Sequence, residues 1–273
     1  QLYKQSIYKI YFIAFFTTVL LCLIFIFLNH NFDGSYWQSL QQSKSALTVE
    51  YCELDQVSHF FRQTMNTYSN LMYFFLGMIV VLIGFHDRKN KKENLNIIQQ
   101  FPALSILLGG CLVYLCFGSA FFHASLTWLG QRIDMNATYS ICLVLIGISF
   151  YKLKNNWPFF QQSKGIYILF VFLLILLFIP LHLLLKSTYL LPFLILLLVI
   201  LTGFNYTKNK KAYSFVLMAF SFIFLIAAFI LRTLDVQKMG CHPTSIYQGH
   251  AVWHVCTGIS AFLLYQFYRN EKV

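Results

Sequence analysis

Residues 165–185 read GIYILFVFLLILLFIPLHLLL, a run of 21 residues without one Asp, Glu, Lys or Arg. A helix needs about 20 apolar residues to cross the hydrocarbon core of a bilayer. The run is continuously apolar rather than alternating, which favours a helix over a strand of a membrane barrel. This stretch therefore predicts an all-α, polytopic membrane protein.

Further apolar runs repeat this pattern along the whole chain. The chain is 58% hydrophobic and only 11% charged, whereas soluble domains carry about 25% charged residues. We predict eight transmembrane helices and no soluble domain. Besides residues 165–185, the predicted spans cover residues 11–28, 66–86, 101–123, 134–151, 188–206, 212–231 and 248–268. The run at residues 11–28 is predicted to be a retained span, since no small-residue cleavage site follows it.

The placement of the basic residues predicts the orientation. If both termini lie in the cytoplasm, the cytoplasmic segments hold 14 of the 20 Lys and Arg residues and the outer segments hold 6. Short cytoplasmic loops carry such an excess, so we predict that both termini are cytoplasmic. The formal net charge of +11 is thereby explained by membrane topology, and we expect neither a nucleic-acid partner nor an obligate protein partner.

Two of the seven cysteines, Cys52 and Cys241, fall outside the predicted spans. Both of their loops are predicted on the outer side, where disulfides form. We predict a Cys52–Cys241 bridge, with free thiols as the alternative.

Polar side chains from three predicted spans meet at one membrane depth, near the outer face. Ser119 and His123 lie in the last turns of one span, Asp134 stands at the start of the next, and His250 and His254 lie in the first turns of the last. Residues four apart share a helix face, so each pair presents its side chains together. Ionisable groups at membrane depth are costly and commonly functional.

This set of side chains suits a catalytic zinc site. Three His ligands leave a fourth position for water, and zinc lowers the pKa of that water to about 7. Asp134 would act as general base and Ser119 would donate to a developing oxyanion. Taken singly, each residue has a plainer interpretation. The histidines could be interfacial residues, Asp134 could cap its helix, and Ser119 could hydrogen-bond to a carbonyl of its own helix.

The first outer loop holds a cluster of acidic residues, Glu50, Glu53 and Asp55. Oxygen ligands of this kind bind hard cations such as Ca²⁺. The alternative is a solvated acidic loop.

At this point the motifs resemble those of the alkaline ceramidases, within the seven-helix membrane hydrolases that include the adiponectin receptors. The resemblance covers about residues 50–268. It rests on the motifs YCELDQ (51–56), NTYSN (66–70), GSAFFH (118–123), an Asp eleven residues after His123, LDVQKMGC (234–241) and HAVWHVCTG (250–258). It implies a hydrolase domain over residues 50–273, preceded by an extra transmembrane helix within residues 1–49.

The resemblance also implies roles for individual residues. His123, His250 and His254 would bind zinc, Asp134 would act on the zinc water, and Ser119 would support the oxyanion. The family pairs the cysteine of the acidic motif with one before the last helix, which corresponds to Cys52 and Cys241.

The same resemblance implies a calcium site in the acidic motif. The positions that match its ligands are Glu50, Tyr51, Glu53, Asp55 and Gln63. The last one departs from the family pattern, because an amide replaces a carboxylate and the spacing is one residue shorter.

We therefore predict a zinc-dependent intramembrane amidase of sphingolipid metabolism, with the active site near the outer face. Its substrate would be ceramide or a related N-acyl lipid, cleaved to a fatty acid and a long-chain base. One alternative is an ester hydrolase on the same scaffold. The other is a receptor-like, lipid-binding protein whose structural zinc is held by Cys241, His242, His250 and His254.

Overall fold

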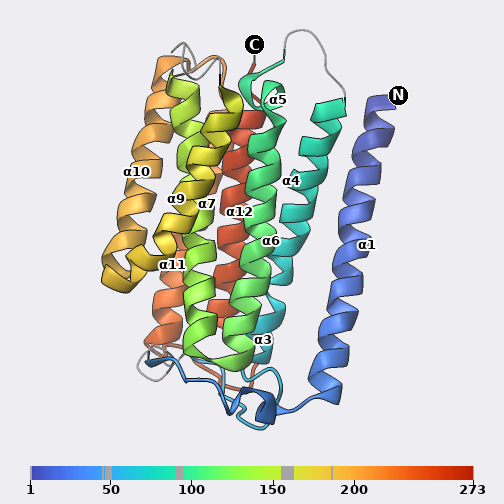
Figure 1. The fold of residues 1–273 in the computed structure, drawn as a ribbon, viewed down its shortest axis with the longest axis vertical. Coiled ribbons are helices and arrows are strands. Elements are labelled where there is room, and N and C mark those ends of the chain that lie inside the picture. Colours follow the sequence, from blue (N-terminus) through green and yellow to red (C-terminus); the bar gives the residue numbers. More distant parts are fainter. Residues whose placement is uncertain are drawn as a thin grey trace.

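The computed structural model describes residues 2–44, 46, 51–89, 95–154, 163–185 and 187–272. Helices make up 79% of these described residues, and Figure 1 shows long, nearly parallel helices with both termini at one end. The long helices are α1 (Leu2–Asn31), α4 (Leu71–Lys89), α6 (Pro102–Ser125), α7 (Trp128–Lys154), α9 (Lys164–Leu184), α10 (Ser187–Lys208), α11 (Phe215–Val236) and α12 (Gly249–Arg269). The short ones are η1 (Gly34–Trp37), α3 (Thr64–Tyr68) and α5 (Ile97–Gln100).

The predicted spans all coincide with helices, and the all-α membrane fold is confirmed. Seven helical stretches in the described part of the chain are long and apolar enough to cross a membrane. The last helix, α12, is not among them because polar residues interrupt it, yet it runs through the middle of the bundle (Figure 1). A helix enclosed by other helices does not meet lipid on every side, so it can carry polar residues.

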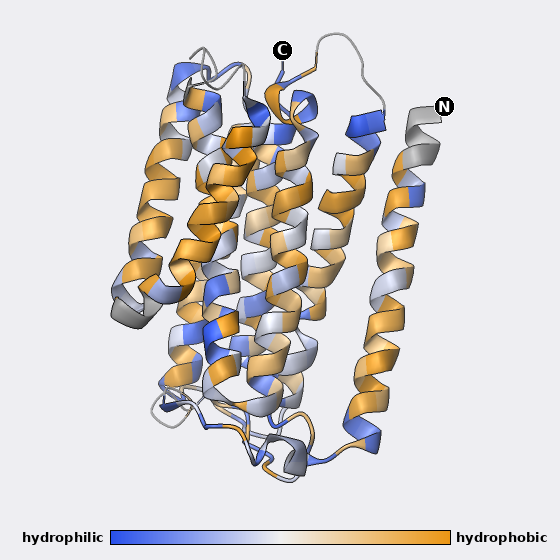
Figure 2. Cartoon of the chain, viewed as in Figure 1, coloured by the Kyte–Doolittle hydropathy of each residue, from blue (hydrophilic) through white to orange (hydrophobic). Residues whose placement is uncertain are grey.

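The hydropathy of the helices follows their surroundings. Apolar residues dominate the lengths of the helices, and hydrophilic residues gather at both ends and inside the lower part of the bundle (Figure 2). We call that lower end, opposite the termini, the site end. There α1 and α6 end, and α7 and α12 begin.

The extra helix α1 lies at the edge of the bundle, packed against α4. The segment that follows it crosses the site end and is tied to the rest of the chain. The Trp37 indole donates to the Phe60 carbonyl at 2.7 Å, and the Ser43 amide donates to the carbonyl of Leu126 at 3.0 Å. The proposed division of the chain at residues 49 and 50 stays a prediction.

At the end that carries the termini, a buried ion pair fixes α12 against α4. The Arg269 guanidinium donates to Asp87 at 2.9 Å, and both side chains are buried. The Asn96 side chain, just before α5, donates to the Arg269 carbonyl. These contacts fix α12 at the end of the bundle opposite the site end.

Two glycines let α4 and α6 approach closely. A Cβ atom placed on Gly109 would lie 2.7 Å from the Gly77 carbonyl oxygen and 2.7 Å from the Val81 amide nitrogen. Small residues at such crossings permit close helix packing in membranes. This contact sets the position of α6, which carries Ser119 and His123.

Replacing Gly109 with alanine is therefore expected to destabilise the protein, because the methyl group meets backbone atoms that cannot move aside. Overpacking of this kind costs about 1–3 kcal/mol. Gly110 is a matched control, since a Cβ atom there meets nothing within 4 Å, and alanine in a helix gains about 0.5–1 kcal/mol over glycine. Thermal unfolding in detergent should give a lower midpoint for Gly109→Ala and an equal or higher one for Gly110→Ala. Equal midpoints in the two variants would contradict the close contact.

Candidate metal centre

Three histidines from two helices meet at the site end. His123 lies near the end of α6, and His250 and His254 lie one turn apart at the start of α12. One ring nitrogen of each lies within 4.8 Å of the others, and all three side chains are buried. Among the residues that the structure describes, this is the group of His, Cys, Asp or Glu side chains that could hold a metal ion.

The hydrogen bond to Gln63 fixes the tautomer of His123. Nδ1 of His123 lies 2.8 Å from Oε1 of Gln63. An amide oxygen can only accept, so Nδ1 carries the proton and Nε2 presents its lone pair to the other histidines. Such an outer partner orients the ring and raises its basicity as a ligand.

The tautomer of His254 is fixed in the same way by Ser69. The Ser69 hydroxyl donates its one proton to the Asn66 carbonyl at 2.9 Å, so it accepts from Nδ1 of His254, 2.7 Å away. The proton of His254 is therefore on Nδ1, and its Nε2 is free to bind a metal.

His250 shows that the group fits a cation. Its Nε2 lies 3.2 Å from Nε2 of His123, while its Nδ1 is buried and has no hydrogen-bond partner among the described residues. Buried polar atoms are nearly always paired. A metal ion bound by the three imidazoles would use the lone pairs that converge here, so the donor set fits such an ion.

The ring of Tyr51 covers His250 on one side. The two ring centroids are 3.8 Å apart and the planes are 25° from parallel. Burial raises the pKa of the Tyr51 hydroxyl, against the opposing effect of nearby Arg232, so this hydroxyl is protonated at neutral pH. The loop residue thus packs on a candidate ligand.

Asp134 and Ser119 come from α7 and α6. Both line the same cavity as His250 and His254. The sequence predicts Asp134 at the start of its span, but α7 begins earlier, at Trp128. Asp134 therefore lies inside the helix and is not its cap. The difference arises because the first turns of α7 contain polar residues that lower its hydropathy.

Asp235, at the end of α11, positions two segments around the site. Its carboxylate accepts from the amides of Cys52 at 3.0 Å and of His250 at 3.1 Å. The second contact satisfies a free amide in the first turn of α12, where a negative charge is favourable. Gly249 permits the approach, since a Cβ atom there would lie 2.9 Å from that of Asp235.

The disulfide joins the same two regions covalently. Cys52 and Cys241 are bonded, with an S–S distance of 2.08 Å and a sequence separation of 189. The bridge ties the loop that carries Tyr51 to the loop before α12. It also means that the Cys241 sulfur is not a free thiolate.

The residues predicted to bind calcium each have another partner where the structure describes them. Glu53 is buried and accepts from the amides of Met65 and Asn66 at 2.5 and 2.7 Å. Asp55 pairs with Arg62. Gln63 and Tyr51 contact the histidines, as described above, and Glu50 lies outside the described residues.

Burial raises the pKa of Glu53 to about 7, and the nearby Asp235 adds a smaller rise. The two amide donors lower this pKa, but by less than burial raises it. Its carboxyl group is therefore only partly ionised at neutral pH. In the described part of the loop, Glu53 fixes the start of α3, beside Ser69 and Gln63. The calcium site stays a prediction.

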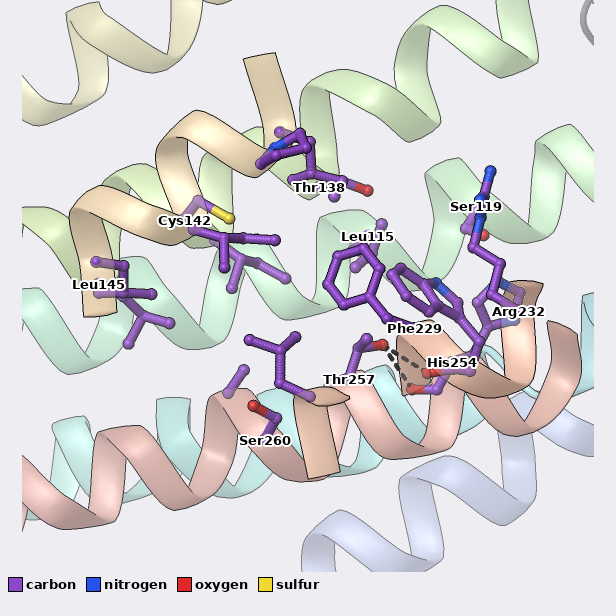
Figure 3. Close-up of a pocket in the computed structure, with 18 of the residues that line it drawn as sticks. Leu115, Ser119, Thr138, Cys142, Leu145, Phe229, Arg232, His254, Thr257 and Ser260 are labelled. Atoms are coloured by element: carbon purple, nitrogen blue, oxygen red, sulfur yellow. Dashed lines mark hydrogen bonds between the residues drawn. The ribbon is translucent and has the colours of Figure 1, made fainter. Parts of the chain in front are cut away.

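A cavity of about 380 Å³ extends from the histidines into the bundle. Figure 3 shows Ser119, Arg232 and His254 at one end of it and Leu145 toward the other. Leu145 follows Asp134 on α7 by roughly 16 Å at 1.5 Å per residue. Most of the lining between them is apolar, so the cavity suits a hydrocarbon chain with a polar group at the histidine end.

Several residues around the site could not be found from the sequence. Ser69 and Asp235 lie within the motifs quoted above, but no spacing rule gives them a histidine or a helix end as partner. The sequence points to Gln63 only as a calcium ligand, whereas it orients His123. The resemblance points to Tyr51 only as a calcium ligand, whereas its ring covers His250.

A comparison with known families gives one match. The family model described as Ceramidase matches residues 43–271. No curated protein and no solved structure matches the chain. The matched segment includes the three histidines, Asp134, Ser119 and both bridged cysteines, and it leaves out α1.

Proposed function

The chain belongs to the ceramidase family, and from this premise we propose that it is a zinc-dependent amidase of the membrane interior. It would hydrolyse ceramide or a related N-acyl lipid to a fatty acid and a long-chain amine. The observation that carries the proposal is the cluster of three buried histidines whose ring nitrogens converge, with the Nε2 atoms of His123 and His254 unprotonated.

Zinc is the metal that this donor set suits best. Neutral imidazoles are common zinc ligands, and three of them leave a position open for chemistry. His123, His250 and His254 would hold the ion. When bound, zinc supplies a Lewis acid and makes a water nucleophilic at neutral pH.

The remaining polar residues would handle protons and charge. Asp134 would accept a proton from the attacking water and return it to the leaving amine nitrogen. Ser119 lines the same cavity, and its hydroxyl would donate to the oxygen of the cleaved carbonyl. Both groups line the cavity, so a substrate held there would meet them.

A lipid substrate is supported by the way the cavity is enclosed. Residues of both α10 and α11 line it. In the described part of the chain, α10 packs against α7 and α11 packs against α12, but α10 and α11 make little contact with each other. A lipid could enter from the bilayer between these two helices while its chains remain in an apolar environment.

The alternative function, a receptor with a structural zinc, lacks one of the four ligands that it requires. It needs Cys241 as a thiolate beside His242, His250 and His254, but Cys241 is bonded to Cys52. Moreover, His123 takes part in the group. An open site of three histidines favours catalysis over a closed structural site.

The test is the incubation of purified protein with two lipids that share their chains, a ceramide and the ester analogue with oxygen in place of the amide nitrogen. We expect cleavage of the ceramide, loss of cleavage after chelation of the metal, and recovery with zinc. Cleavage of the ester alone would replace the amidase by a lipid esterase. Absence of cleavage of either lipid in the zinc-loaded protein would refute hydrolysis.

We further propose that both termini are cytoplasmic and that the site end faces the opposite compartment. The excess of basic residues at the end with the termini supports this orientation. Labelling of Cys52 and Cys241 after reduction, with a reagent that does not cross membranes, would place them on the outer side. Labelling only after permeabilisation would reverse the orientation.

Gln63→Leu is expected to weaken zinc binding about 10–100-fold, as loss of a ligand's hydrogen-bond partner commonly does. Leucine leaves Nδ1 of His123 without an acceptor and frees the ring to change tautomer. Competition with a chelator measures the affinity. Gln63→Glu should retain it, because a carboxylate still accepts, and Gln41→Leu makes the same change on an exposed side chain. Equal affinity in Gln63→Leu and Gln41→Leu would argue against the orienting role.

A further inference from the structure

We propose that Arg232 binds an anionic group on the polar head of the lipid substrate. The preferred substrates would then be N-acyl lipids with an acidic head group, such as a phosphate ester, rather than neutral ceramides. This inference rests on the proposed function and deepens it by naming the class of substrate.

Arg232 lies at the polar end of the cavity. It belongs to the last turns of α11 and lines the cavity together with Ser119, Asp134 and His254. Figure 3 shows its side chain at the same end of the pocket as Ser119 and His254. A lipid whose amide reaches the histidines would place its head group at this end.

The guanidinium has no carboxylate partner among the described residues. Asp235 is three residues away on the same helix, but its oxygens accept from the amides of Cys52 and His250. No ion pair of Arg232 occurs within the described ranges.

Within the described ranges, the contacts of Arg232 leave most of its donors free. Its guanidinium lies over the Trp253 ring, 5.9 Å from its centroid, and its charge acts to lower the pKa of the nearby Tyr51 hydroxyl. A guanidinium carries five N–H donors in a planar fork that matches carboxylate and phosphate oxygens. A cation at a membrane-embedded site without an anion is costly, so a ligand that supplies the anion is favoured.

The start of α10 adds further hydrogen-bonding groups. Ser187 and Thr188 line the same cavity and are exposed. They belong to α10, whereas Arg232 belongs to α11. A head group that reached both helices would meet hydroxyls and the guanidinium, which together suit an acidic group better than an apolar one.

The experiment compares a ceramide with its 1-phosphate, with the same chains, in neutral detergent so that no other anionic lipid competes. The wild-type protein should have the higher kcat/KM for the phosphate. Arg232→Gln should lower that value about 10–100-fold, mainly through KM, as expected for the loss of charge-assisted hydrogen bonds, and it should affect the neutral ceramide much less. Arg232→Lys should retain part of the preference, because it keeps the charge but not the fork.

Two outcomes would overturn the proposal. One is a wild-type preference for the neutral lipid. The other is an equal loss on both lipids in Arg232→Gln that Tyr51→Phe reproduces. The latter would mean that Arg232 acts only through its neighbour Tyr51, since phenylalanine keeps the ring on His250 but removes the hydroxyl.

A binding measurement separates this proposal from the proposed function. Thermal stabilisation by each lipid can be measured in an Asp134→Asn background, where no turnover is needed. A preference for the phosphate that disappears on adding Arg232→Gln supports the head-group site even if the protein hydrolyses neither lipid. Equal stabilisation by both lipids, with and without Arg232, would refute the site independently of catalysis.

Discussion

Asp134→Asn is expected to keep its zinc and lose amidase turnover by about 10²–10⁴-fold, the usual contribution of a general base. Asparagine has the same size as aspartate, so the helix packing should survive. Its amide cannot take a proton from water at neutral pH. The loss should therefore appear in kcat, with zinc content unchanged, when ceramide hydrolysis and elemental analysis are carried out on the same sample.

Asp55→Asn is the matched control for this prediction. It makes the same chemical change on a carboxylate that pairs with Arg62 outside the cavity. It should retain nearly all turnover. If Asp134→Asn retained as much, Asp134 would have no part in proton transfer.

His250→Ala is expected to abolish zinc binding at stoichiometric concentrations. Removal of a ligand should cost more than the 10–100-fold in affinity that follows loss of a ligand's hydrogen-bond partner. Elemental analysis should give about one zinc per chain for the wild type, the content that one three-histidine site with an open fourth position would hold, and almost none for the variant. The same result is expected for His123→Ala and His254→Ala.

His30→Ala serves as the control here, because His30 is exposed at the end of α1, away from the three-histidine group. It should bind zinc like the wild type. Full zinc content in all three site variants would remove the metal centre and, with it, the proposed mechanism. Loss of zinc with a normal thermal midpoint would show that the metal serves catalysis more than folding.

The apolar runs alone predict most of the fold. A membrane helix satisfies its own backbone hydrogen bonds and needs only length and hydropathy, which are local properties of the sequence. For the same reason, the boundaries that are wrong are those where hydropathy is a poor guide. The predicted start of α7 is six residues late, at Asp134 instead of Trp128.

The sequence also indicates the metal group, for a reason that is again local. The i, i+4 spacing of His250 and His254 puts both on one face of a helix, and the alternation of spans brings the end of α6 to the start of α12. Depth in the membrane follows from position in a span. Three ligands can therefore be assigned to one level without knowledge of how the helices pack.

Only the tertiary structure gives these ligands their orientation and surroundings. Gln63 and His123 are 60 residues apart, Ser69 and His254 are 185 apart, and Asp235 reaches Cys52 over 183 residues. Such contacts depend on where loops cross the end of the bundle, and no helical period constrains a loop. In the sequence, Arg232 resembles an ordinary basic residue at the end of a span, whereas in the fold it lies in the cavity without a carboxylate partner among the described residues. The sequence by itself thus determined the helices and the depth of the site, because both are set by local spacing. Only tertiary packing determined which ring nitrogens of His123 and His254 carry protons. It also placed the charge of Arg232 at the cavity.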